Sequence, residues 1–166
     1  MKHLGSSRIF ASHYQLMLTD SLSREITDGM NWNKEKTQRG YAGDSNTIMI
    51  GTEADLNDHW VELYQTESIP CFQKFQRVYC LFFACEKGKV VVSSVIDDVA
   101  AIESDLKVGD YTVYIAATNL GVDQLSLGED SELTDEVYKE RYDIERYKIF
   151  IVAGKPNMEG KIRDVS

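Results

Sequence analysis

The acidic side chains between residues 123 and 145 are the chemically most distinctive groups in the sequence. This stretch, DQLSLGEDSELTDEVYKERYDIE, holds nine acidic and two basic residues, and therefore has a net charge of −7. The whole chain has 27 acidic and 18 basic residues, a net of −9, which leaves −2 for the remainder. Like charges at this density repel one another and oppose folding. We therefore expect a solvated loop, a surface for a basic partner, or a cation site.

Carboxylates in such number could also catalyse a reaction or bind calcium. A catalytic pair needs two carboxyls fixed roughly 5–10 Å apart in a cleft, whereas these residues crowd into loop-like sequence rather than onto strands. The segment Glu129-Asp130-Ser131-Glu132 does not match the D-x-[DN]-x-[DN]-G calcium loop. The sequence therefore predicts neither a catalytic pair nor a dedicated calcium site, and occasional binding of a cation stays open.

The histidines and cysteines do not add a predicted site. The three histidines are His3, His13 and His59, and the three cysteines are Cys71, Cys80 and Cys85. The histidines have no metal-ligand spacing, and no histidine neighbours a cysteine. The cysteines are odd in number and lack paired spacing, so we expect reduced, buried thiols. No nucleophile elbow, P-loop or dinucleotide fingerprint is present, and we expect no catalytic residue, metal or cofactor.

An acidic segment held on a scaffold could instead mimic a nucleic-acid backbone, with carboxylates in place of phosphates. Tyrosines are enriched at interfaces and could anchor such a contact. The predicted partner-binding residues are Glu129, Asp130, Glu132, Asp135, Glu136, Tyr138 and Tyr142, with Tyr147 as a further possible anchor. Packing of these tyrosines onto a sheet is the open alternative. An isoelectric point of 4.8 argues against direct binding of nucleic acid and favours a basic protein partner.

Length and composition indicate one globular domain over residues 1–166, with an ordered core over about 9–153. The chain is 43% hydrophobic and 27% charged, as is usual for soluble proteins, and is long enough to bury one core. The first ten residues lack the apolar core of a secretory signal, and no apolar run reaches membrane-spanning length. We expect a cytoplasmic protein without membrane contact. Nothing in the sequence predicts an oligomeric state.

Short runs of alternating apolar residues, separated by turn residues, predict an all-β scaffold. Strands are expected over 9–18, 48–51, 60–64, 75–86, 90–92, 111–117 and 147–151, and residues 99–106 fit either a helix or a strand. A hairpin turn at 86–89, with Gly88 at positive φ, would join the central strands. The tail from residue 154 is expected to fray.

Two short helices complete the predicted elements. Asn33 can cap one that ends at Gly40, and Thr134 can cap another over 135–142. The predicted fold is mainly β, a two-layer antiparallel β-sandwich with one or two short helices.

The run WNKEKTQRGYAGDSNTIMI, residues 32–50, resembles the competence protein J (ComJ) family. In that family a Trp and a short charged helix lead into Gly-Tyr-Ala, a polar turn and a strand. Further similar segments occur in the same order: SHYQ at 12–15, Gly88 with the strand at 90–94, the Leu-x-x-Gly-Asp-Tyr turn at 106–111, and the strand at 147–152. The resemblance covers about residues 9–153.

The resemblance implies inhibition, because the family is known as an intracellular inhibitor of a nuclease that acts in DNA uptake, a metal-dependent DNase. Relatives of such inhibitors serve as immunity proteins against toxin nucleases. This chain is longer than the family member compared, and much of the extra length coincides with the acidic stretch. The expected function is an immunity-type inhibitor, not an enzyme, whose acidic surface binds the basic active-site cleft of a DNase. The alternative is a β-sandwich module that binds a small ligand or carbohydrate through exposed aromatics such as Trp32, Trp60 and Tyr64.

Overall fold

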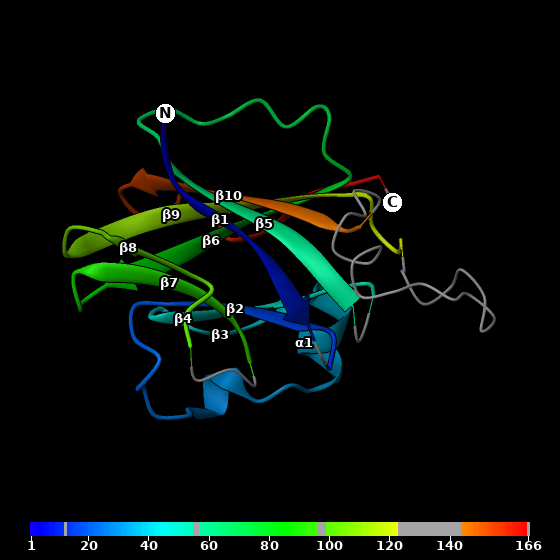
Figure 1. Cartoon of the computed structure of the whole chain (residues 1–166), viewed down its shortest axis with the longest axis horizontal. Helices are drawn as coiled ribbons and strands as arrows, with labels where there is room; N and C mark the ends of the chain where they lie inside the picture. The colour runs from blue at the N-terminus through cyan, green and yellow to red at the C-terminus, as the bar shows by residue number, and fades with distance from the viewer. Residues whose placement is uncertain (12, 55–56, 96–98, 123–143, 166) are drawn as a thin grey trace.

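Two β-sheets face each other, and Figure 1 shows the six-stranded sheet above the five-stranded one. The computed structural model describes residues 1–11, 13–54, 57–95, 99–122 and 144–165. Within these residues the larger sheet has the spatial order β1 (Lys2–Ala11), β5 (Asn57–Gln65), β10 (Arg146–Ala153), β9 (Gly109–Thr118), β6 (Arg77–Cys85) and β11 (Gly160–Asp164). The smaller has the order β3 (Tyr41–Asp44), β4 (Thr47–Gly51), β2 (Gln15–Thr19), β7 (Lys89–Ser94) and β8 (Ile102–Asp105). The predicted mainly β fold is confirmed.

The apolar alternation of the strands builds the core between the sheets. In β9, Tyr111, Val113 and Ile115 point into this core, as Val61 and Leu63 do in β5. Successive strand residues point to opposite faces, so one phase of each strand supplies the interior. The alternation that predicted these strands therefore also identifies their inward face.

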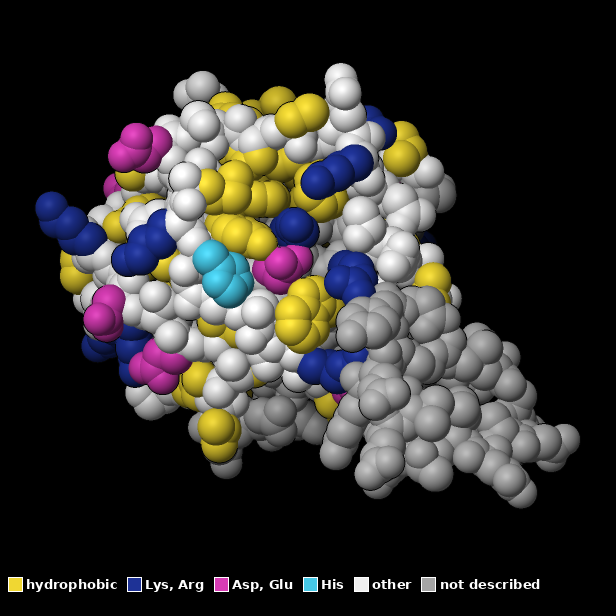
Figure 2. Space-filling view, turned by 45° about the horizontal axis from the view of Figure 1, so that its top comes forward, with side chains coloured by type: hydrophobic (Ala, Val, Ile, Leu, Met, Phe, Trp, Pro, Cys, Tyr) yellow, Lys and Arg dark blue, Asp and Glu magenta, His cyan; other side chains and the backbone are white. Residues whose placement is uncertain are grey.

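A second apolar cluster lies on the outer face of the six-stranded sheet. It consists of Phe75, Val78, Cys80, Tyr114, Ala116 and Phe150, with Tyr64, Phe72 and Val152 packed against it. Figure 2 shows apolar side chains gathered in the middle of one face of the molecule, between charged side chains. Because β6 and β9 are largely buried on both faces, their sequences are almost continuously apolar.

The single strand predicted over residues 9–18 is wrong. The strand β1 ends at Ala11 and β2 begins at Gln15, in the other sheet. Between them His13 and Tyr14 both have a φ of 58°, which turns the chain. The prediction places Phe10 on the same face as Leu16 and Leu18, but Phe10 is 46% exposed and the buried residues of β1 are Ile9 and Ala11, so the inward phase changes across this break.

The hairpin predicted at residues 86–89 is also wrong, because β6 and β7 lie in different sheets. Gly88 does have the expected positive φ, 73°. The buried carboxylate of Asp20 accepts hydrogen bonds from the amides of Glu86 and Lys87, at 2.8 and 3.1 Å. A residue far away in the sequence therefore holds this crossing between the sheets.

Three further elements refine the predicted topology. The tail, expected to fray, forms β11, which pairs antiparallel with β6. Residues 99–106, which fit either a helix or a strand, include β8. The strands β5 and β10 run parallel, whereas the other paired strands are antiparallel.

The predicted helix after Asn33 is confirmed as α1 (Lys34–Arg39). The Asn33 side chain accepts a hydrogen bond from the Lys36 amide at 2.9 Å, and Gly40 ends the helix with a φ of 90°. A 3-10 turn, η1 (Asp28–Met30), precedes it. The helix predicted over 135–142 lies outside the described residues. No described helix is long and apolar enough to cross a membrane.

Candidate functional site

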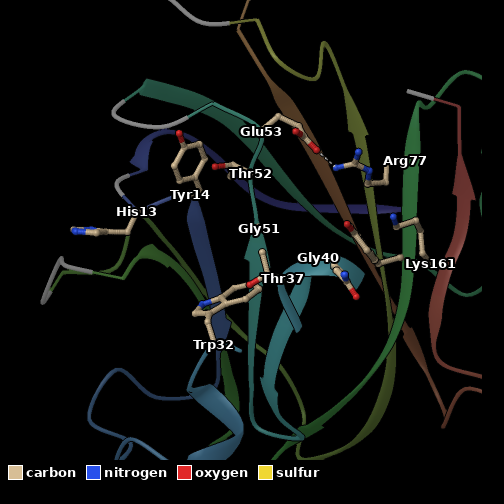
Figure 3. Close-up of a pocket in the computed structure, with 12 residues that line it drawn as sticks. His13, Tyr14, Trp32, Thr37, Gly40, Gly51, Thr52, Glu53, Arg77 and Lys161 are labelled. Carbon is tan, nitrogen blue, oxygen red and sulfur yellow. Dashed lines mark hydrogen bonds and ion pairs between the residues drawn. The ribbon is translucent and has the colours of Figure 1, made fainter. Parts of the chain in front are cut away.

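A pocket of about 510 Å³ opens where the two sheets meet α1 and the β1–β2 connection (Figure 3). Segments that are distant in sequence form its wall: His13, Tyr14, Trp32, Thr37, Gln38, Gly40, Gly51, Thr52, Glu53, Arg77, Tyr79 and Lys161. Much of the wall comes from the segment 32–50 and the residues directly after it. The residues that carry the family resemblance therefore also shape this pocket.

The rim is formed by two residues in an uncommon backbone conformation. His13 and Tyr14 are left-handed, with φ of 58° each, and the Thr52 amide donates to the Tyr14 carbonyl at 2.8 Å. For residues other than glycine this conformation costs energy and is found more often at functional sites. The Tyr14 side chain remains 53% exposed, at the mouth of the pocket.

The floor is backbone and aromatic surface. The Gly51 amide donates to the Gly40 carbonyl at 2.9 Å. A Cβ at Gly40 would collide with the Tyr79 hydroxyl, so this position requires glycine for space as well as for its positive φ. The Trp32 indole N–H donates to Gln15 Oε1 at 2.7 Å, which fixes the orientation of the ring beside the floor.

The opposite wall is ionic and internally paired. The Arg77 guanidinium forms an ion pair with Glu53, drawn as a dashed line in Figure 3, and lies 3.5 Å from Asp164. Lys161 Nζ lies 2.9 Å from the same Asp164 carboxylate. Two cations and two carboxylates thus balance one another on this side of the pocket.

Behind this wall, the buried carboxylate of Glu145 joins three parts of the chain. Its Oε1 accepts hydrogen bonds from the amides of Glu53, Ala54 and Gly121, at 3.1, 3.0 and 2.9 Å. Its Oε2 lies 2.9 Å from His59 Nε2 and accepts a hydrogen bond from the Tyr147 hydroxyl at 3.1 Å. Both Glu145 and His59 are fully buried.

Hydrogen bonds keep Glu145 in its charged form. Burial alone would raise the pKa of this carboxyl, but the bonds from His59, the Gly121 amide and Tyr147 outweigh burial and lower it. Burial and the adjacent Glu145 charge raise the pKa of Tyr147 well above its ordinary value, so its hydroxyl stays protonated and donates. The cluster is a stable anchor for the chain at neutral pH.

Most of the predicted contact residues lie outside the described part of the chain. These are Glu129, Asp130, Glu132, Asp135, Glu136, Tyr138 and Tyr142. The structure does describe residues 144 and 145 at the end of the acidic stretch, and the chain up to residue 122 before it. Glu145 belongs to the acidic stretch by sequence but is buried, and Tyr147 is only 2% exposed, so of the two roles left open for Tyr147 the structure shows packing in the core rather than a surface anchor.

The aromatic platform of the alternative hypothesis is not assembled as one surface. Trp32 lines the pocket, whereas Trp60 and Tyr64 lie on the outward phase of β5. Tyr64 stacks on Phe150 with ring centroids 5.6 Å apart, and its hydroxyl donates to Glu62 at 2.8 Å. The described structure thus separates Trp32 from Trp60 and Tyr64.

The thiols agree only partly with the sequence prediction. Cys80 and Cys85 are buried, and burial raises the pKa of both. Cys71 is exposed, so the expectation of three buried thiols is wrong. Among the described residues, no group of three or more potential ligands is arranged to hold a metal.

Sequence reasoning missed both the pocket and the buried Glu145 cluster. The pocket combines segments whose proximity has no local signature. The cluster did have one: Glu145 is in phase with Tyr147, Ile149 and Ile151 along β10, as His59 is with Val61 and Leu63 along β5. Ionisable residues in the inward phase of two strands require partners, and here they meet each other.

The two-sheet fold is similar to that of two solved structures. The crystal structure of ComJ from Bacillus subtilis, described as an inhibitor of the DNA degrading activity of NucA, has a similar fold: the TM-score is 0.65 at 16% identity, covering 92% of this chain and 98% of that one. The structure described as crocagin biosynthetic gene J has a TM-score of 0.52 at 13% identity, covering 90% and 98%. At these identities the similarity shows a shared fold.

Family membership follows from the sequence match. A family model described as Competence protein J (ComJ) matches residues 8–145, which is most of the chain. The chain therefore belongs to the ComJ family. No curated protein sequence matches it.

Proposed function

We propose that this chain inhibits a DNA-degrading nuclease by binding to it. The observation that carries the proposal is the match to the ComJ family over residues 8–145. The fold shared with a ComJ described as an inhibitor of the DNA degrading activity of NucA adds support. Inhibition by binding requires no reaction on the inhibitor, so in this proposal the chain is not an enzyme. It acts in the cytoplasm as an immunity-type protein.

The partner in this proposal is a basic, metal-dependent DNase, and the acidic segment occupies its active-site cleft. A cleft that binds DNA attracts carboxylates for the same reason that it attracts phosphates. Mg²⁺ prefers oxygen ligands, so a carboxylate of the segment can also approach a catalytic metal ion. Glu145 supports this arrangement, because it lies at the end of the segment and accepts a hydrogen bond from the amide of Gly121, just before the segment, and another from the amide of Glu53.

A nuclease assay tests the function directly. The full-length chain is immobilised, the protein it retains from the native host is purified, and its degradation of plasmid DNA is measured with increasing amounts of the chain. We expect degradation to fall to background near one inhibitor per nuclease. If the retained protein has no DNase activity, or if a molar excess of the chain leaves that activity unchanged, the proposed function is wrong.

Charge neutralisation tests the acidic segment separately. The variant replaces three Glu and two Asp by Gln and Asn, at Glu129, Asp130, Glu132, Asp135 and Glu136. We expect association with the nuclease to slow by about tenfold or more at low salt, and its salt dependence to flatten. An unchanged rate and salt slope would contradict the role of the acidic segment, even if inhibition persists.

A matched control keeps the same change in net charge. It makes the same three Glu→Gln and two Asp→Asn replacements at exposed positions of the described scaffold: Glu25, Glu35, Glu67, Asp28 and Asp105. We expect this control to associate at close to the wild-type rate. If it slows association as much as the first variant, net charge rather than the segment steers the partner.

A further inference from the structure

The end pocket is a second feature of the surface that the acidic segment does not explain. We propose that it receives one uncharged apolar or aromatic side chain of the nuclease, and that this contact determines how slowly the complex dissociates. The inference rests on the proposed inhibitor function and adds to it a second contact with different chemistry.

The charges in the pocket wall indicate an uncharged guest. Arg77 pairs with Glu53 and lies close to Asp164, and Lys161 pairs with Asp164. A charged guest would have to break one of these pairs, and it would leave a partly buried charge without its partner. The side-chain charges that face the pocket here are therefore already matched within the protein.

The rest of the wall combines three aromatic rings and two glycines with polar side chains: Tyr14, Trp32, Tyr79, Gly40, Gly51, His13, Thr37, Gln38 and Thr52. The Trp32 ring is held by its bond to Gln15, and the floor at Gly40 and Gly51 has no side chains. The volume of about 510 Å³ accommodates a large side chain together with part of its backbone. Rigid aromatic pockets of this kind are where a few interface residues contribute most of the binding energy.

A partner's side chain fits the pocket better than a free small molecule does. Sites for small molecules orient their ligands with a few convergent polar groups. In this pocket the ionic groups are paired with one another, and the Trp32 N–H is bonded to Gln15. The exposed Tyr14 at the mouth, held there by left-handed backbone, adds contact area that a protein surface can cover.

The position of the pocket links it to the acidic segment. Glu53 lines the pocket with its side chain, while its amide donates to Glu145 at 3.1 Å. The same Glu145 oxygen accepts from Gly121, next to the start of the segment, at 2.9 Å. The described residues that flank the segment, Gly121 and Glu145, are therefore linked to the pocket through Glu53. Long-range charge would control association and the pocket would control dissociation.

Filling the pocket tests the inference. Gln38 is an exposed residue of α1 that lines the pocket, so Gln38→Trp places an indole in the space without disturbing the core. Tyr14→Asn removes the ring at the mouth and suits the left-handed backbone, which asparagine tolerates. Binding is measured by surface plasmon resonance against the nuclease that the wild-type chain inhibits, at several salt concentrations. We expect each variant to dissociate about tenfold faster or more, with association and its salt slope within about twofold of wild type.

The same substitution away from the pocket is the control. Gln73 is exposed and does not line the pocket, so Gln73→Trp should dissociate at the wild-type rate. Thermal unfolding of all three variants verifies that they fold. If folded Gln38→Trp and Tyr14→Asn dissociate like wild type, the pocket inference is wrong while the inhibitor function stands. If the wild-type chain inhibits no DNase, both fail.

Discussion

Two buried carboxylates, Asp20 and Glu145, perform similar tasks at different places with different chemistry. Each accepts hydrogen bonds from backbone amides far away in the sequence, and each is fully excluded from solvent. Asp20 holds the crossing from β6 to β7, and Glu145 holds the attachment of the acidic segment. They differ in what compensates their charge.

Asp20 is neutralised by a permanent cation near the surface. Arg24 binds it through two guanidinium nitrogens and also contacts Glu86, and 23% of the Arg24 side chain is exposed. Glu145 instead relies on His59 and Tyr147, both buried. A buried carboxylate can therefore anchor the fold when a partly exposed arginine compensates its charge, as at Asp20. A carboxylate in the core, such as Glu145, needs a complete network of buried hydrogen-bond partners.

Breaking the buried network should have the largest effect. We expect Glu145→Ala to lower the free energy of unfolding by about 3–5 kcal/mol, because it leaves His59, Tyr147 and three amides without their acceptor. Urea denaturation measures this. Glu145→Gln, which keeps one carbonyl acceptor, should cost less. A loss below about 1 kcal/mol for the alanine variant would mean that the cluster does not anchor the chain.

Removal of the Asp20 carboxylate should lower the free energy of unfolding less than removal of the Glu145 carboxylate. We expect Asp20→Ala to lower the free energy of unfolding by about 2–3 kcal/mol, since it removes the acceptor of the Glu86 and Lys87 amides. Arg24 can turn towards solvent, whereas His59 cannot. Urea denaturation of both alanine variants in parallel decides the order. An equal or larger loss for Asp20→Ala would reverse the comparison.

Both carboxylates should make the protein sensitive to acid. Burial alone would raise the pKa of Asp20, but hydrogen bonds from Arg24 and from the amides of Glu86 and Lys87 outweigh burial, so the pKa lies below its ordinary value. The pKa of Glu145 is also lowered. The stability they contribute is present above their unfolded-state pKa values, near 4, and is lost as pH falls through the folded values. Asp20→Asn and Glu145→Gln should each reduce the slope of stability against pH below 4 by up to about 1.4 kcal/mol per pH unit. Unfolding at a series of pH values measures it, and unchanged slopes would contradict the assignment.

The smallest effect should come from one donor of the buried network. Tyr147→Phe removes the hydroxyl that donates to Glu145 at 3.1 Å and keeps the ring in the core. We expect a loss of about 1 kcal/mol in the free energy of unfolding, the usual net value of one hydrogen bond. A matched control is Tyr111→Phe, whose hydroxyl donates to the Lys107 carbonyl outside the cluster. If Tyr147→Phe leaves the free energy of unfolding unchanged, Glu145 does not depend on this donor.

The features that the sequence predicted correctly are those set by neighbouring residues. Asn33 and Gly40 determine the ends of α1 through their own side chain and backbone freedom. The alternation in β9 is local as well, because burial of one face follows from the strand itself. Such elements can be predicted from nearby residues alone, without the rest of the fold.

The features that the sequence did not predict depend on distant residues. Large apolar residues at Phe10, Leu16 and Leu18 suggest one continuous face, but Phe10 is exposed, and only the pairing of β1 and β2 with distant strands shows that the chain changes sheets. The turn at Gly88 suits a hairpin equally well, and the Asp20 carboxylate that binds the Glu86 and Lys87 amides in the crossing lies far away in the sequence. The pocket joins Tyr14, Trp32 and Lys161, which no spacing rule connects.

The pairing of β9 with β10 places the acidic segment in the connection between two adjacent strands. Thr118 and Arg146 are partners in the antiparallel ladder, so everything between them is, in topological terms, the loop of a hairpin. The entropy of closing a flexible loop grows only with the logarithm of its length, at about 0.6 kcal/mol for each doubling. Insertions or exchanges within residues 123–143, which leave Gly121 and Glu145 in place, should therefore change the fold little. The scaffold can evolve or be engineered toward new partners by replacing one loop while its strands stay paired.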